Sequence, residues 1–127
     1  MPRTRVVFYQ ESPGNVPVVD FLLRLRERNQ QAYVRCVAAM KRLAEMGHEL
    51  RRPTADYLRD GIYELRAKEG RVNYRILCFF HGAQLAVLGH ALTKEDRVSP
   101  TDIDRAVRRI QNFKKHPSVH TYEEQLP

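Results

Sequence analysis

Three consecutive segments with the alternating pattern of β-strands, residues 62–67, 72–80 and 84–94, limit the possible fold of this chain more than any other feature. The turn-forming pair Asp60-Gly61 precedes the first, and only a few residues separate each segment from the next. Strands joined by such short connections pair as antiparallel neighbours, because a parallel pair needs a crossover of about a dozen residues or more. We therefore predict an antiparallel meander.

Helical patterns lie on both sides of the meander. Apolar residues recur at helical spacing in two stretches ahead of it, and the capping-box sequence Ser99-Pro100-Thr101-Asp102 marks a helix start after it. A β-branched and aromatic run, residues 6–9, indicates one more strand. The predicted elements are a strand at 6–9, helices at about 17–26 and 30–46, a loop at 48–61, the meander, and a helix from 100 to about 113.

This element order predicts an α+β fold. We expect a small, mostly antiparallel four-stranded sheet, covered by an N-terminal helix pair and a C-terminal helix. With 127 residues, the chain is long enough for one hydrophobic core. We assign a single domain to residues 1–116 and expect residues 117–127, which show little pattern, to form a loosely ordered tail.

The charge balance points to a class of partner. The chain has 22 Lys and Arg against 15 Asp and Glu, a formal net charge of +7 and a pI near 9.8. In a domain this small, such an excess favours a polyanionic partner, with nucleic acid first, over a surface charged only for solubility.

Cysteine usage and hydropathy indicate the cellular compartment in which the protein works. Cys36 and Cys78 lie in apolar runs without metal-binding spacing, which predicts buried free thiols in a reducing compartment, with no metal and no cofactor. No apolar stretch approaches the roughly 18–20 residues of a membrane span. The apolar segment near the N-terminus is too short for a signal peptide. We therefore expect a cytoplasmic protein without membrane association.

Charged residues lie inside the meander strands as well as in the turns. Side chains alternate across a strand, so Glu64 and Arg66 share one face, and Arg75 lies on one face of the next strand. His90 and Lys94 share a face of the third strand. If the polar strand ends align, these five residues converge on one side of the sheet. The cluster would then either bind a phosphodiester or consist of cross-strand ion pairs around Glu64.

Part of this pattern is shared with a known family. The residues concerned are Tyr63-Glu64-Leu65-Arg66, Gly70-Arg71, Tyr74-Arg75-Ile76-Leu77, His90 in an apolar strand, and Lys94 ahead of Ser99-Pro100. With the element order, the region from Asp20 to Phe113 resembles the RelE/ParE toxin superfamily, and most of all its HigB-like, phage-derived branch. The resemblance implies a RelE-like, microbial-ribonuclease-like fold. It also implies the toxin of a type II toxin–antitoxin pair, an mRNA interferase that cuts message in the ribosomal A site.

The resemblance implies roles for individual residues. Arg75 matches the family's strand arginine at the scissile phosphate, while Arg66 and Lys94 match further basic positions. Cleavage by the adjacent 2′-hydroxyl needs a base, an acid and cations, without a metal ion. Glu64 is a candidate base and His90 a candidate acid or base. Candidate contacts to RNA or ribosomal RNA are Arg51, Arg52, Arg59 and Arg71.

The partners that the resemblance implies are mRNA, the ribosome and a cognate antitoxin, commonly of the helix-turn-helix type. Two other functions stay open. ParE-like relatives share the fold and inhibit DNA gyrase. The other possible function is that of a non-catalytic, basic nucleic-acid-binding accessory protein. It stays open because Glu64 and Glu95 lie near positions where relatives carry lysines.

Overall fold

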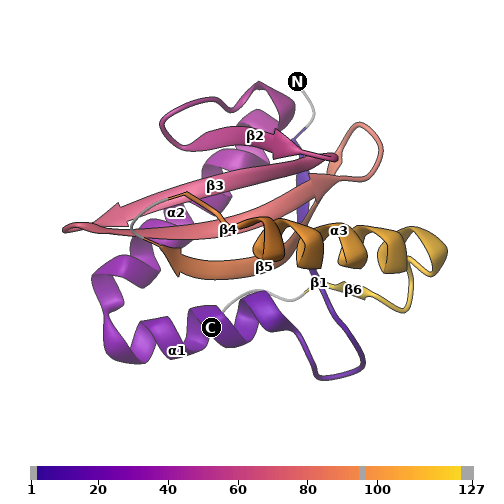
Figure 1. Cartoon of the computed structure of the whole chain (residues 1–127), viewed down its shortest axis with the longest axis horizontal. Helices are drawn as coiled ribbons and strands as arrows, with labels where there is room; N and C mark the ends of the chain where they lie inside the picture. The colour runs from indigo at the N-terminus through magenta and orange to yellow at the C-terminus, as the bar shows by residue number, and fades with distance from the viewer. Residues whose placement is uncertain (1–2, 95–96, 124–127) are drawn as a thin grey trace.

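The computed structural model describes residues 3–94 and 97–123, where one mixed sheet lies between helices (Figure 1). The strand order is β2-β3-β4-β5-β1-β6, and every neighbouring pair is antiparallel except β1 and β5. The elements are β1 (Arg5–Tyr9), α1 (Pro17–Arg28), α2 (Gln30–Met46), a 3-10 turn (Gly47–Glu49), β2 (Ala55–Arg59), β3 (Ile62–Glu69), β4 (Val72–Phe80), β5 (Leu85–Lys94), α3 (Pro100–Lys115) and β6 (Thr121–Tyr122). The predicted α+β class and the meander are confirmed.

The helices cover opposite faces of the sheet (Figure 1). α1 and α2 pack on one face, where Leu22 and Leu43 join Ile76 in a core cluster. α3 packs on the other face, where Phe113 joins Leu77 in a separate cluster. Each helix therefore buries one apolar stripe against the sheet, as its periodicity predicts.

The sheet has six strands among the described residues, so the expectation of four was wrong. The first additional strand, β2, lies inside the predicted loop at 48–61. Asp60 and Gly61 both have positive φ, 54° and 82°, and they connect Arg59 to its partner Ile62. A two-residue turn with both φ values positive matches the twist of paired strands, so Asp60-Gly61 closes a hairpin. The pair is therefore more than the predicted turn ahead of residues 62–67, because it joins two paired strands.

The second additional strand, β6, lies inside the segment that was expected to be a loose tail. Phe8 and Tyr9 of β1 pair with it, and the His120 ring stacks on Tyr9 with 5.2 Å between centroids. The Gln10 side-chain amide donates to the Val119 carbonyl at 2.9 Å. These contacts hold the chain as far as Tyr122 against the edge of β1. Residues 124–127 of the predicted tail lie outside the described residues.

A bulge in β5 changes which side chains share a face. Leu77 pairs with His90 and Cys78 pairs with Leu88, so Gly89 is an extra residue in β5. Strict alternation counted back from His90 predicts Val87 on the opposite face of the strand, but the structure places the two residues on the same face. The bulge shifts the alternation by one residue, so both face α3.

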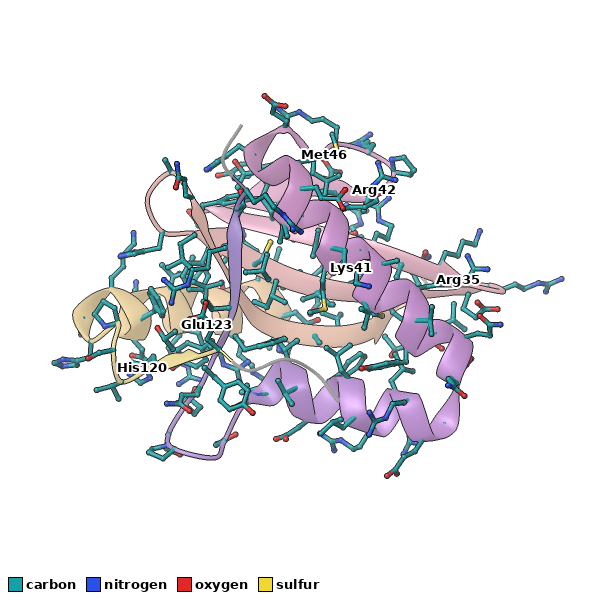
Figure 2. All side chains as sticks on the ribbon, turned by 180° about the vertical axis from the view of Figure 1, so that it is seen from behind. Arg35, Lys41, Arg42, Met46, His120 and Glu123 are labelled. Carbon is teal, nitrogen blue, oxygen red and sulfur yellow. The ribbon has the colours of Figure 1, made fainter. Side chains whose placement is uncertain are left out.

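The outer side of α2 is basic. Arg35, Lys41 and Arg42 are exposed there, as the view from behind shows (Figure 2). Arg35 pairs with Glu69 at the end of β3 at 2.5 Å. No helix in the described part of the chain is long and apolar enough to cross a membrane.

Candidate functional site

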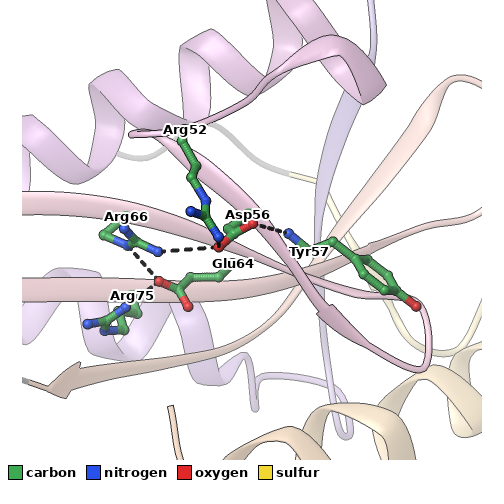
Figure 3. Close-up of polar contacts among 6 residues, drawn as sticks. All are labelled: Arg52, Asp56, Tyr57, Glu64, Arg66 and Arg75. Atoms are coloured by element: carbon green, nitrogen blue, oxygen red, sulfur yellow. Dashed lines mark hydrogen bonds and ion pairs between the residues drawn. The ribbon is translucent and has the colours of Figure 1, made fainter. Parts of the chain in front are cut away.

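Two arginines and one carboxylate meet on the α3 face of β3 and β4. Arg66 and Arg75 are direct cross-strand partners, and Glu64 lies two residues before Arg66 on the same face. The Arg66 Nε donates to Glu64 Oε1 at 2.7 Å, and the Arg75 Nη1 donates to the same oxygen (Figure 3). The predicted cross-strand ion pairs around Glu64 are thus present, with both guanidinium groups on one carboxylate oxygen.

The charged side chains of this cluster are unusually buried. Glu64 is 2% exposed and Arg75 is 6% exposed. Taking a charge out of water costs several kcal/mol unless a partner compensates it, so each buried charge here depends on the other. Asp56 of β2 extends the network, with Arg52 at 2.9 Å and Arg66 at 3.9 Å from its Oδ2 (Figure 3). The result is a chain of alternating charges that crosses three strands.

The charged cluster forms one wall of a cleft of about 730 Å³. The opposite wall is the start of α3, with its N-cap Ser99. We call this the arginine cleft; its lining residues are Asp56, Leu58, Arg59, Glu64, Arg66, Arg75, Arg97, Val98, Ser99, Pro100 and Ile103. Four arginines against two carboxylates leave an excess of positive charge in the lining, and the N-terminal end of a helix adds a positive partial charge. The arginine cleft therefore suits an anion.

His90 lies on the same face but is not among the residues that line the arginine cleft. Its Nε2 is 3.0 Å from Asp102 Oδ1, and its Nδ1 is 3.5 Å from Arg109 Nη1. Burial lowers the pKa of His90 below its ordinary value, with a further lowering from Arg109 and Arg105 and an opposing effect of Asp102. A neutral ring that donates from Nε2 to Asp102 fits these contacts.

This environment predicts a pH effect on stability. Below pH 6.5 His90 binds a proton more readily in the unfolded chain than in the folded chain. The free energy of unfolding should therefore decrease as the pH falls, by up to about 1.4 kcal/mol per pH unit. We expect urea unfolding between pH 7.5 and 5.5 to show this loss in the native chain, and a smaller loss in His90→Gln. His116→Gln, which removes an exposed histidine, is the control. Parallel pH profiles for the native chain and His90→Gln would contradict the prediction.

The other predicted site residues are distributed more widely. Arg59 lines the arginine cleft and pairs with Asp104 of α3 at 2.8 Å. Arg71 is exposed in the turn between β3 and β4. Arg51 and Arg52 precede β2 and line a different cleft. The backbone of Lys94 pairs with Asn73, but its side chain lies outside what the structure describes.

Three residues outside the predicted set belong to this region. Asp56 lies in β2, where the sequence pattern indicates a loop, and Arg97 follows the last predicted strand. Arg109 of α3 is buried and donates to the Gly89 carbonyl at 2.6 Å. Its position three residues after Ala106 and four before Phe113 places it on the apolar stripe, a pattern that could have identified it.

The described residues contain no group of three or more His, Cys, Asp or Glu placed to hold a metal ion. Cys36 and Cys78 are free and buried, as predicted. Burial raises the pKa of each thiol to about 12, which makes both poor nucleophiles and poor metal ligands.

Comparison with known families matches residues 23–111, more than two thirds of the chain, to the family described as phage derived protein Gp49-like (DUF891). The matched region contains β2 to β5 and every residue that lines the arginine cleft. No curated protein matches the chain significantly.

Proposed function

The chain belongs to the phage-derived Gp49-like family, a toxin-like family of the RelE type, and on this basis we propose that it is the toxin of a toxin–antitoxin pair. We further propose that it acts as a ribosome-dependent mRNA endoribonuclease, and that its cognate antitoxin, of the helix-turn-helix type, restrains it. A HigB-like toxin would fit this description.

The arginine cleft is the observation that carries the proposal. RNA cleavage by the neighbouring 2′-hydroxyl builds negative charge on the phosphate, and fixed guanidinium groups lower the energy of that charge. Arg66 and Arg75 come from adjacent strands and are held by the same carboxylate, so their positions are set before substrate binds. Arginine forks also match phosphate oxygens in geometry.

The residues of the cleft can be given steps. The 2′-oxygen attacks the adjacent phosphorus and loses its proton to a base, for which Glu64 is the candidate in the cleft. The bond from phosphorus to the 5′-oxygen breaks and the leaving oxygen takes a proton from water, which leaves a 2′,3′-cyclic phosphate and a 5′-hydroxyl. Arg75 and Arg66 stabilise the phosphorane, and Lys94 is a further candidate cation.

His90 fits a positioning role in this scheme. It holds Asp102, whose Oδ2 accepts from the Ser99 hydroxyl at 2.6 Å. Ser99 lines the cleft and caps α3, so His90 acts on the cleft wall through Asp102.

The proposal is tested by mapping message 5′ ends after brief induction of the chain in bacteria that lack the antitoxin. We expect new ends inside translated frames, carrying a 5′-hydroxyl, because the mechanism leaves the 5′-oxygen without phosphate. Blocking translation initiation on a reporter message should remove its cuts if the ribosome is required. Intact messages despite soluble protein would contradict the proposal. If a DNA-damage response accompanied them, gyrase would become the target to test.

A further inference from the structure

A cleft of about 690 Å³ lies at the edge strand β2, beside the 3-10 turn after α2. We call it the tyrosine cleft; its lining residues are His48, Leu50, Arg51, Arg52, Ala55, Asp56, Tyr57 and Tyr63. Tyr57 and Tyr63 are cross-strand partners and share the face opposite Glu64. The arginine cleft does not contain these aromatic residues, so the tyrosine cleft needs its own explanation.

The aromatic rings in this region form a connected series. The rings of Tyr57 and Tyr63 are 5.0 Å apart in an edge-to-face arrangement, and those of Tyr63 and Phe80 are 5.2 Å apart. His48 stacks on Phe80 at 3.7 Å. Tyr57 ends the series and is 53% exposed, although its hydroxyl accepts from the Gly61 amide at 3.1 Å. An aromatic ring fixed at its edge and its hydroxyl, with area open to solvent, can stack on a planar group.

Arginine side chains lie between the Tyr57 ring and the arginine cleft. Arg51 lines the tyrosine cleft and donates to the Leu50 carbonyl at 3.2 Å. Asp56 lines both clefts, and Arg52 and Arg66 both reach its Oδ2. In Figure 3, Tyr57 points away from Asp56 on the side opposite Arg66 and Arg75. A strand of nucleic acid that leaves the arginine cleft over β2 therefore meets guanidinium groups first and the Tyr57 ring next.

We propose that the tyrosine cleft is a second nucleotide subsite, in which a base of single-stranded RNA stacks on Tyr57 while Arg51 and Arg52 contact its phosphates. This inference rests on the proposed function, because it extends the path of the same RNA. Aromatic stacking combined with backbone cations is the usual means of binding single strands without reading their sequence.

The test is equilibrium binding of a fluorescein-labelled ten-nucleotide RNA with 2′-O-methyl groups, which block attack by the 2′-oxygen. Loss of one stacked base typically weakens binding by about 5- to 150-fold, so we expect this loss in Tyr57→Leu. Tyr57→Phe keeps the ring and should bind like the native chain. Inorganic polyphosphate has no bases, so its binding should be the same for the native chain and for Tyr57→Leu. Thermal melting checks that both variants fold.

Three results would overturn the inference. If Tyr57→Leu binds RNA like the native chain while Arg66→Ala binds it more weakly, the subsite is absent and the proposed function stands. If Tyr57→Leu weakens RNA and polyphosphate equally, stacking is not the interaction. If Tyr57→Leu leaves RNA binding intact and instead reduces co-purification of the antitoxin, the occupant of the cleft is a peptide. Failure of the proposed function is a separate result, because it appears as uncut messages in the mapping experiment.

Discussion

Arg75→Ala is expected to lower the rate of message cleavage by a factor on the order of 100 to 1,000, the usual effect of removing one fixed donor to a developing oxyanion. Arg75 is 6% exposed, lies in the middle of β4 and is held by Glu64, so its guanidinium is fixed before the phosphate arrives. The measurement is the rate at which 5′-hydroxyl ends accumulate on one reporter message at equal levels of soluble protein.

The alanine variant also removes a partner from a buried carboxylate, which typically costs about 3–5 kcal/mol of stability. Arg75→Lys separates the two effects, because it keeps a positive charge beside Glu64 and loses the two-pronged contact to phosphate. We expect Arg75→Lys to fold and to cleave at least tenfold more slowly than the native chain, since one lost charge-assisted hydrogen bond is worth roughly 1.5–3 kcal/mol.

Arg35→Ala is the matched control, since Arg35 is an exposed, ion-paired arginine far from the cleft in sequence and on the outer side of α2 (Figure 2). It should cleave at the native rate. Native cleavage by folded Arg75→Lys and Arg75→Ala would show that the arginine cleft does not hold the scissile phosphate.

Phe113→Ala is expected to reduce the free energy of unfolding by about 3–5 kcal/mol, a large share of the roughly 5–15 kcal/mol that holds a typical domain folded. Phe113 is fully buried between α3 and the sheet. Its ring lies 5.6 Å from Phe79 and 5.1 Å from His81, both in edge-to-face geometry. Alanine leaves a cavity at the point that fixes the C-terminal half of α3. Urea unfolding followed by circular dichroism measures the loss.

The same substitution should affect function through the fold. The first turn of α3 forms a wall of the arginine cleft, so weaker docking of α3 should lower cleavage even at temperatures where the chain stays folded. Val119→Ala is the control, because Val119 is 50% exposed and its truncation should change stability by less than about 0.5 kcal/mol. A loss below about 1 kcal/mol in Phe113→Ala would mean that α3 does not depend on this contact.

Much of the site could be predicted because its key residues lie on two adjacent strands. Alternation placed Glu64 and Arg66 on one face of their strand, and a tight turn limited the registers that could bring Arg75 of the next strand beside them. The structure brings these three together. The prediction did not include Arg97 or Asp56. The position of Arg97 depends on the path of the chain after β5, and that of Asp56 depends on the pairing of β2, which was predicted as a loop.

The sequence by itself determined the meander, the helix cap at Ser99 and the apolar stripes of the helices, because each depends on residues close together in the chain. The tertiary structure alone decided the face of Val87 and the contacts of His90. The bulge at Gly89 puts Val87 on the same face as His90, and Arg109, twenty residues away in the sequence, donates to the bulge carbonyl. A contact between two elements leaves no periodic pattern in the sequence of either element. The alternation of residues in β5 therefore could not reveal the position at which its side chains exchange faces.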